Sequence, residues 1–219
     1  MAGLIRSRST RPRRDSLTRV AVFIDYQNTY MGARRTFGTT DAVPVEGQVA
    51  PHHLGELLTT RGLTVDPSRR LDRVTVYRGV PSPHHSPIGH AACERQLEVW
   101  RRANRVRCVT RPLAYQRSAT GAGASRLLGR EKGIDVLIAL DMATGALLDE
   151  YDVAILVSAD TDLIPVVERV RSAGKRCEVA AWRSPGVGAP RLSLPGLWCH
   201  WLDSRDYDMV RDDTDYTVG

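Results

Sequence analysis

Short runs of consecutive apolar residues alternate along the chain with segments whose apolar residues recur every three or four positions. The runs are rich in β-branched residues, as in "VAVFI" after Arg19 and "VAILV" after Asp152. Such runs are typical of strands buried on both faces of a sheet, and the longer period is typical of helices that cover them. The expected strands are 20–25, 73–79, 105–110, 152–159 and 175–182, and the expected helices are about 28–36, 51–61, 88–103, 131–148 and 162–173.

This alternation predicts an α/β protein with a three-layer α/β/α, Rossmann-like arrangement around a central, mainly parallel sheet. In such sheets ligands bind beyond the carboxyl ends of the strands. Residues 116–130, rich in glycine, serine and arginine, predict a mobile loop near that edge, and residues 183–196, with three prolines and three glycines, predict a second loop.

The two ends of the chain differ in composition from its middle. Residues 1–18 are rich in arginine and serine without periodicity, which predicts a disordered basic arm. Residues 203–219 are rich in aspartate and predict an acidic flexible tail. The remaining residues, 19–202, are expected to form one domain, because 219 residues with 42% hydrophobic content suit a single core.

The net charge of +6 comes almost wholly from arginine, since Lys132 and Lys175 are the two lysines of the sequence. A basic protein favours polyanionic partners, and the planar guanidinium binds phosphate in a bidentate manner. RNA is therefore a candidate partner, although arginine in place of lysine also follows from the base composition of a gene.

The cysteines and the apolar runs bear on where the protein works. The four cysteines are widely spaced and form no CxxC pair, which favours buried thiols in a reducing compartment: Cys93, Cys108, Cys177 and Cys199. Zinc is not expected either, because no cysteine stands at metal-binding spacing from the histidine pairs 52–53 and 84–85. No apolar run is long enough to span a membrane, and the beginning of the chain lacks the apolar core of a secretion signal. We expect a cytoplasmic protein without a membrane partner.

Carboxylates follow two of the expected strands. Asp25 ends the first run, where it could start a turn, cap the next helix, or lie at the ligand-binding edge of the sheet. Asp160 and Asp162 follow "AILVSA" before the next helix, which one of them could cap. Two like charges placed together are costly unless a cation compensates them, so this pair suggests a divalent metal.

A third acidic segment is "EKGIDVLIALDM", which places Glu131 and Asp135 one helical turn apart. Glu131 is readily explained as a complement to the helix dipole, whereas Asp135 lies among apolar residues. Asp25, Asp135, Asp160 and Asp162 are oxygen donors of the kind that bind Mg²⁺ or Mn²⁺, and such sites usually serve phosphate chemistry. Asn28 could orient a water or a phosphate oxygen there, or could cap the following helix.

Three stretches, "VAVFIDYQNTY", "EKGIDVLIALDM" and "SADTDLIPVVERVRSAGKRCEV", resemble the motifs of NYN domains, the LabA-like members of the PIN-like nuclease superfamily. The resemblance runs from about Arg19 to Trp182 and implies a PIN-like fold, an aspartate cluster that holds Mg²⁺ or Mn²⁺, and ribonuclease activity. It implies these site residues: Asp25, Asn28, Asp135, Asp160 and Asp162 in catalysis, with Ser158 nearby and Lys132 near phosphate.

The chain departs from the family pattern at two glycine positions, which are Tyr26 and Ala159 here. Loss of glycine can narrow the crevice. Tyr26 could stack on a base or pack beneath the next helix.

The leading hypothesis is a metal-dependent ribonuclease that acts on single-stranded or structured RNA. Basic residues in helix starts and loops would bind along the sugar-phosphate backbone of the RNA: Arg34, Arg35, Arg117, Arg126, Arg130 and Lys132. The alternative is a non-catalytic regulator that binds RNA or a protein on the same fold. A phosphatase of the aspartyl-phosphate type is less supported, because Asp25 is not followed two residues later by a second aspartate. A homo-oligomer or a regulatory protein partner stays open.

Overall fold

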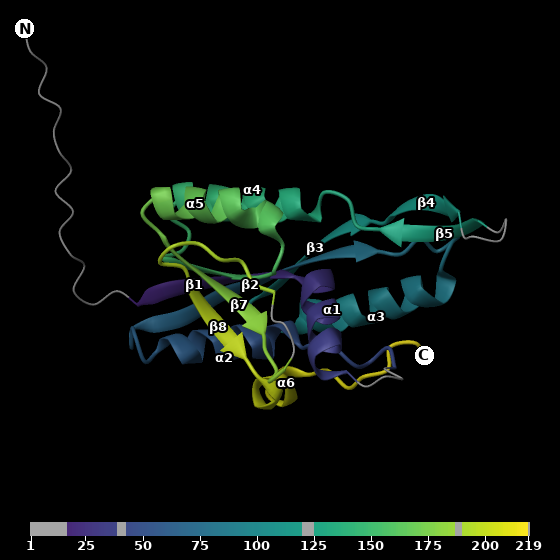
Figure 1. Cartoon of the computed structure of the whole chain (residues 1–219), viewed down its shortest axis with the longest axis horizontal. Helices are drawn as coiled ribbons and strands as arrows, with labels where there is room; N and C mark the ends of the chain where they lie inside the picture. The colour runs from purple at the N-terminus through teal and green to yellow at the C-terminus, as the bar shows by residue number, and fades with distance from the viewer. Residues whose placement is uncertain (1–16, 39–42, 120–124, 187–189, 219) are drawn as a thin grey trace, which may run out of the picture.

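A six-stranded, all-parallel sheet forms the centre of the protein (Figure 1). The computed structural model describes residues 17–38, 43–119, 125–186 and 190–218. The strand order is β3-β2-β1-β6-β7-β8. Their bounds are β1 Thr18–Asp25, β2 Arg69–Val80, β3 Val106–Pro112, β6 Val153–Val157, β7 Arg176–Trp182 and β8 Trp198–Leu202.

Helices cover both faces of this sheet, which confirms the three-layer prediction. On one face lie α4 and α5, and on the other lie α1, α2 and α3, with the short α6 near the outer strand β8 (Figure 1). Their bounds are α1 Tyr26–Phe37, α2 Pro51–Gly62, α3 Pro87–Arg102, α4 Ile134–Leu147, α5 Ile164–Ser172 and α6 Ser204–Val210. Within the described residues, none of the helices is long and apolar enough to cross a membrane.

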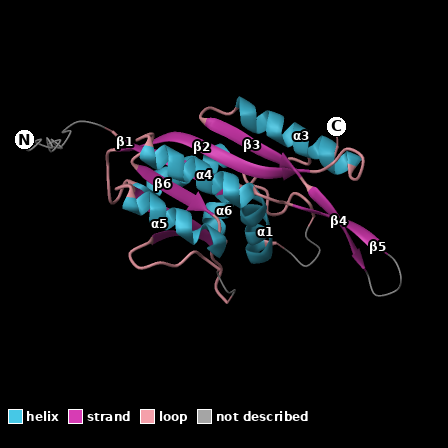
Figure 2. Cartoon of the chain, turned by 90° about the horizontal axis from the view of Figure 1, so that it is seen from above, coloured by secondary structure: helices cyan, strands magenta, loops and turns pink. Residues whose placement is uncertain are grey.

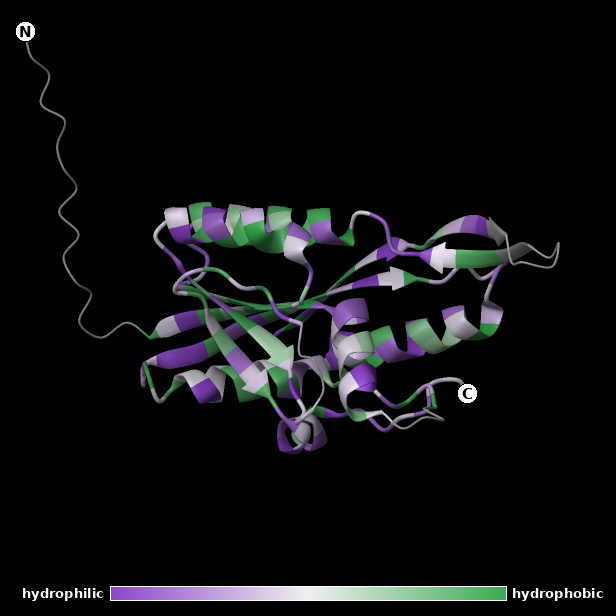
Figure 3. Ribbon diagram, in the orientation of Figure 1, coloured by the Kyte–Doolittle hydropathy of each residue, from purple (hydrophilic) through white to green (hydrophobic). Residues whose placement is uncertain are grey.

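The central strand β1 explains why its sequence is a continuous apolar run. Val20, Val22 and Ile24 face the core beneath α1, α2 and α3, whereas Ala21 and Phe23 face the core beneath α4 and α5. All five are at most 1% exposed, because both faces of a central parallel strand are covered. Hydrophobic residues also dominate α4 (Figure 3). Ile138 and Met142 of this helix are buried against the sheet, whereas Val136 and Leu140 are exposed to solvent.

The prediction of a loop over residues 116–130 is wrong for most of that segment. An antiparallel hairpin, β4 Ala114–Ala119 and β5 Ser125–Arg130, occupies it. The hairpin extends away from the body of the molecule (Figure 2). Pairing between the two strands satisfies the backbone groups, so the hairpin forms without the apolar alternation that announces a strand in sequence. Residues 120–124, at its turn, lie outside the described residues.

The prediction of a flexible tail over residues 203–219 is also wrong where the chain is described. Helix α6 begins there with a capping box, in which the Asp203 carboxylate accepts from the N–H of Asp206 and the Asp206 carboxylate accepts from the N–H of Asp203. Arg61 of α2 pairs with Asp206 at 3.0 Å, and Tyr216 is 7% exposed. These contacts hold the segment against the domain.

Three further boundaries differ from the expectation. Strand β8 was not predicted, and α4 begins at Ile134, not at residue 131. Gly133 precedes α4 with φ +74, a left-handed conformation that glycine adopts readily and that separates the helix from the residues before it. The expected basic arm of residues 1–18 lies outside the described residues up to residue 16, and Thr18 already belongs to β1.

Candidate functional site

The strand order reverses direction at the centre of the sheet. From β1 the chain builds β2 and β3 on one side, and β6, β7 and β8 stand on the other. This makes the junction of β1 and β6 a topological switch point, where open parallel sheets form a crevice at their carboxyl edge. Ile24 pairs with Val157 in register, so Asp25 and Ser158 leave the two strands side by side.

Asp25 is held by two hydrogen bonds at this junction. Its Oδ1 accepts from the N–H of Asn28 at 3.1 Å, which caps α1, and its Oδ2 accepts from the Ser158 hydroxyl at 3.1 Å. Burial raises the pKa of Asp25 above its usual value, and the carboxylates of Asp160 and Asp135 raise it further against these two hydrogen bonds. Asp25 therefore caps α1, and burial and the nearby carboxylates make its ionised form unfavourable.

Asn28 and Asp160 connect the first turn of α1 to the segment after β6. The side-chain oxygen of Asn28 accepts from the N–H of Ala159 at 3.0 Å. The N–H of Asp160 donates to the Ser158 hydroxyl at 3.1 Å, and Asp160 Oδ1 accepts from the N–H of Asp162 at 2.9 Å, which caps the 3-10 turn Thr161–Leu163. Asp25, not Asn28, is thus the cap of α1, and the Asn28 carboxamide fixes the loop that carries Asp160.

These residues line one open cavity of about 420 Å³, which we call the carboxylate crevice. It is bounded by Asp25, Asn28, Asp135, Asp160 and Glu131, together with Gln27, Met31, Gly133 and Ile134. The structure therefore brings together four of the five predicted catalytic residues. Asp162 is the exception: it is exposed on the 3-10 turn and does not line the crevice.

Glu131 is the acid that the sequence interpretation assigned to the helix dipole, and the structure places it in the crevice wall. It precedes α4 and accepts a hydrogen bond from the N–H of Gly79, at the end of β2. Burial raises the pKa of Glu131 to about 7, with a further contribution from Asp25. A Cβ on Gly79 would lie 2.7 Å from Glu131 Cγ, so the glycine permits this approach. In the sequence, the signals that Glu131 lies outside the helix and against β2 were Gly133, which precedes α4, and Gly79, which allows the close contact.

The crevice offers the chemistry that a hard divalent cation requires, namely several carboxylate oxygens whose mutual repulsion a cation would relieve. The side chains do not, however, converge on one point. Among the described residues, no three histidine, cysteine, aspartate or glutamate side chains are close enough to hold a metal ion as they stand. The donor set fits Mg²⁺ or Mn²⁺ in its chemistry, and it is not a preformed cage.

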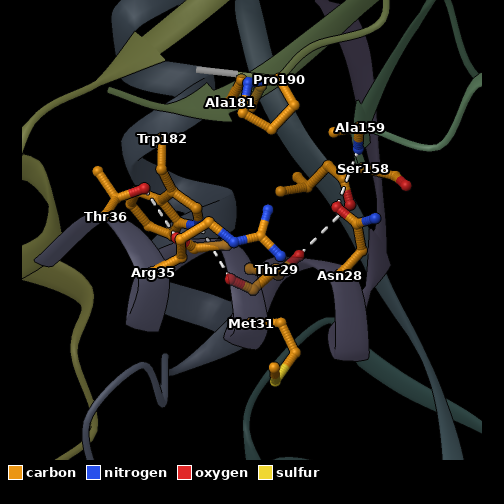
Figure 4. Close-up of a pocket in the computed structure, with 13 residues that line it drawn as sticks. Asn28, Thr29, Met31, Arg35, Thr36, Ser158, Ala159, Ala181, Trp182 and Pro190 are labelled. Atoms are coloured by element: carbon orange, nitrogen blue, oxygen red, sulfur yellow. Dashed lines mark hydrogen bonds between the residues drawn. The ribbon is translucent and has the colours of Figure 1, made fainter. Parts of the chain in front are cut away.

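A second pocket adjoins the crevice at Asn28 and Met31, beyond the carboxyl ends of β6 and β7. Arg35 extends its side chain into this pocket, which Trp182 and Thr29 also line (Figure 4). The indole N–H of Trp182 donates to the backbone oxygen of Thr29 at 2.9 Å. Arg35 thus places a positive charge in the pocket that adjoins the carboxylate crevice.

The other predicted cations lie in different settings. Arg34 donates to the Tyr30 hydroxyl at 2.7 Å and lies over that ring, so it packs on α1 and lines neither the crevice nor the Arg35 pocket. Three exposed cations lie on the hairpin or just after it, and none of them lines the crevice: Arg117, Arg130 and Lys132. The backbone of Arg126 pairs with Ser118 in the same hairpin.

Arg111 is a cation that sequence reasoning missed. One nitrogen of its guanidinium lies 3.3 Å from where a Cβ on Gly133 would stand, which places the charge at the rim of the carboxylate crevice. Arg111 lies at the end of β3, and its signal in the sequence was only its position at the carboxyl end of an expected strand.

Tyr26 packs in the core, which was one of the two roles expected for it from the sequence. It is 3% exposed, and its ring lies 4.5 Å from that of Trp100 in an edge-to-face contact. It is therefore part of the core at the start of α1.

This combination of a parallel sheet and an acidic crevice at its switch point is accompanied by a family match. The chain belongs to the NYN domain family, which matches residues 19–190, and a PIN-like placement is consistent with that match. NYN domains are generally nucleases. No curated protein matches the chain. One similar solved structure is a protein of unknown function from Vibrio parahaemolyticus, which is 20% identical over 76% of this chain and 82% of that chain, with a TM-score of 0.49.

Proposed function

We propose that this NYN domain protein is a metal-dependent ribonuclease that hydrolyses phosphodiester bonds of single-stranded or structured RNA. The observation that carries the proposal is the carboxylate crevice, where aspartates from three separate segments and Glu131 line one cavity at the switch point of the sheet. Acids gathered at a ligand-binding edge with raised pKa values are typical of functional sites.

Asp25, Asp135 and Asp160 would hold the Mg²⁺ or Mn²⁺ ion. Such an ion supplies positive charge that activates a water and offsets the charge of the phosphoryl oxygens. The hydrogen bonds from Asn28 N–H and the Ser158 hydroxyl keep both Asp25 oxygens at the rim of the crevice. The N–H of Asp162 fixes the Asp160 carboxylate, so Asp162 enters the proposed site through its backbone.

Glu131 is suited to hold or release a proton close to neutral pH, because its pKa is about 7. Arg111 at the rim and Arg35 in the adjoining pocket would bind phosphates on either side of the reacting bond. The exposed cations of the hairpin, Arg117 and Arg130, would attract the chain at longer range, with Lys132 beside the crevice.

The test is cleavage of labelled RNAs and single-stranded DNA with Mn²⁺, with Mg²⁺ and with EDTA. We expect metal-dependent cutting by the wild type and a loss of at least about a hundredfold in Asp160→Asn. Asp208→Asn is the matched control, because Asp208 is exposed on α6. Cleavage that is unaffected by EDTA, or by Asp160→Asn, would refute the proposed site.

A second candidate function is a non-catalytic regulator that binds RNA or a protein. It is favoured by the carboxylates that do not converge among the described residues and by Tyr26 and Ala159 in place of glycine. It predicts binding that is indifferent to metal, with no cleavage under any of the conditions above.

A further inference from the structure

A third pocket, which we call the side pocket, opens beside the carboxylate crevice and shares two of its walls, Gln27 and Glu131. It lies between the start of α1, the end of β2 and the helix α3, and residues 215–217 near the end of the chain close its far side. Its volume is about 330 Å³, which is within the range of pockets that bind small organic ligands. A ligand that fills the side pocket would contact the two residues that also line the carboxylate crevice.

The polar groups of the side pocket are fixed in advance. The Gln96 amide donates to the Tyr26 hydroxyl at 3.1 Å and to Gln48 Oε1 at 2.6 Å, and its carbonyl oxygen accepts from Arg78. Gln96 is 3% exposed and Gln48 is 9% exposed. A buried network that is already satisfied keeps its shape, so the pocket does not have to reorganise to receive a flat, partly polar ligand.

Arg78 carries the positive charge of this pocket. Its guanidinium lies 4.8 Å from the centre of the Tyr26 ring and 5.5 Å from that of the Trp100 ring. Among the described residues no carboxylate lies within ion-pair distance of it, although it lowers the pKa of Glu131 from a longer range. A guanidinium that is oriented by aromatic rings and has no paired anion attracts a phosphate or the acceptor atoms of a base.

The opposite rim of the pocket is acidic. Asp215 accepts from the Thr217 hydroxyl at 2.6 Å and from the N–H of Thr217 at 2.9 Å, and these two hydrogen bonds lower its pKa, so its carboxylate is ionised at neutral pH. A nucleotide therefore has one favourable orientation, in which its phosphate lies toward Arg78 and the crevice and its uncharged base fills the pocket.

We propose that the side pocket holds a single unstacked nucleobase, on the nucleotide next to the phosphate bound in the carboxylate crevice. This inference rests on the proposed ribonuclease function and adds a specificity site to it. The rings of Tyr30 and Tyr216 line the pocket beside the space for the base, and Glu131, which also lines the crevice, offers its carboxyl group to the edge of the base. Such a site selects single-stranded or looped RNA, because a paired base cannot leave its helix without an energetic cost.

Ala92→Phe is the decisive variant, because Ala92 lines the side pocket from α3 and is not among the residues that line the carboxylate crevice. A phenyl ring there fills the space for the base. The matched control is Val99→Phe, which adds the same ring to the same helix at an exposed position outside the pocket. Thermal melting of both variants shows that each is folded.

The first readout is the affinity for a short, labelled, single-stranded RNA, measured by fluorescence polarisation in EDTA so that no cleavage occurs. We expect Ala92→Phe to weaken binding about tenfold, the effect of losing one stacked base, and Val99→Phe to leave it unchanged. The second readout is photo-crosslinking of 4-thiouridine RNA to the wild type, with crosslinks expected on the peptides that carry Tyr30 and Tyr216. It does not depend on the folding of any variant.

The outcomes separate the two proposals. If the wild type cleaves RNA with metal, but Ala92→Phe binds normally and the crosslinks fall outside the pocket, the base site is refuted and the ribonuclease stands. If the wild type neither binds nor cleaves any RNA, both are refuted together. A tenfold loss with crosslinks in the pocket supports the base site, even in a protein that binds RNA without cutting it.

Discussion

At the scale of single residues, Asp25 combines contacts that stabilise the fold with an environment that disfavours its charge. The side chain caps α1 and accepts from Ser158, yet burial and two neighbouring carboxylates raise its pKa. A raised carboxyl pKa means that the folded state disfavours the ionised form, so the ionised side chain lowers the free energy of unfolding at neutral pH.

Asp25→Asn should therefore stabilise the metal-free protein at pH 7. The carboxamide keeps an oxygen for the N–H of Asn28 and an N–H₂ for the Ser158 hydroxyl, while it removes the charge. At this chain length each kcal/mol changes the melting temperature by roughly 2–4 °C, so an increase of a few degrees is expected in EDTA. Asp208→Asn, on the exposed side of α6, should show no change.

Metal addition gives a further prediction at the same position. Mg²⁺ or Mn²⁺ should raise the melting temperature of the wild type, because a ligand of the folded state stabilises it by mass action. In Asp25→Asn this increase should be largely lost. An equal increase in both proteins would show that the cation binds elsewhere.

Glu131 gives a prediction in pH. Its pKa is raised from 4.5 to about 7, so the folded state binds more protons than the unfolded state between these values. The free energy of unfolding contributed by this group is fully present below about pH 4.5 and is lost as the pH rises through 7. Glu131→Gln keeps the acceptor for Gly79 N–H and should be more stable than the wild type at pH 8, by about 1–3 kcal/mol after allowance for partial exposure. Urea unfolding at pH 5 and pH 8 measures the difference, which should nearly vanish at pH 5.

What the sequence could predict at this scale depends on backbone direction. Asp25 and Asp160 were expected together because strand ends of a parallel sheet meet at one edge. Asp135 lies in a helix, and it joined them through its donor chemistry and the resemblance to the NYN motifs. Asp162 was expected beside Asp160, but the 3-10 turn directs it to solvent, and no residue pattern distinguishes that turn from the start of a helix. Glu131 was assigned to the polar start of the apolar helix that follows it, whereas that helix begins only at Ile134, after Gly133.

At the scale of elements, regular segments were predictable and marginal ones were not. The strands with continuous apolar runs and the long helices follow from their periodicity, because burial on a sheet imposes that pattern. The β4–β5 hairpin has only Leu127 and Leu128 as an apolar signal in its second strand, and its stability comes from pairing with Ala114–Ala119. Helix α6 was hidden by its aspartates, although Asp203 and Asp206 have the spacing of a capping box.

The hairpin makes a prediction about RNA binding. Arg117 and Arg130 are both exposed on it, and the register places their side chains on opposite faces of the two strands, with Arg130 directly before Glu131. Neutralising both, as Arg117→Gln with Arg130→Gln, should weaken RNA binding and reduce the slope of log affinity against log salt by about 1.4, at roughly 0.7 for each phosphate contact of a single strand. The control is Arg169→Gln, in the last turn of α5, which should leave the slope unchanged. An unaltered slope in the double variant would remove the hairpin from the RNA path.

At the scale of the whole molecule, two cores on opposite faces of one sheet hold the crevice at the edge between them. The pattern of buried residues on β1 fixes which helices cover which face, and the strand order then places Asp25 beside Ser158. The sequence predicts the layers but not the strand order, because many orders bury the same apolar runs. The family match supplied the order of motifs, and the structure shows where the chain reverses.

A buried ionic cluster links distant strands of the same sheet. Arg69 of β2 donates to Glu178 of β7 at 2.9 Å, and His200 of β8 lies 2.8 Å from the same carboxylate. All three side chains are at most 1% exposed. Burial alone would raise the pKa of Glu178, but the bonds to His200 and Arg69 outweigh it and hold this pKa below its usual value near 4.5.

Glu178→Gln should therefore destabilise the protein strongly, because it leaves the Arg69 charge buried without an anion. Breaking a buried pair in this way costs about 3–5 kcal/mol, measured as a lower urea midpoint at pH 7. The matched control, Glu168→Gln on the exposed side of α5, should stay within about 0.5 kcal/mol of the wild type. A carboxylate with a lowered pKa contributes stability above about pH 4.5 that is lost as the pH falls through its folded value, so the gap between wild type and Glu178→Gln should narrow in acid. A gap that is small at pH 7, or that widens as the pH falls, would show that the cluster does not hold β2, β7 and β8 together through this charge.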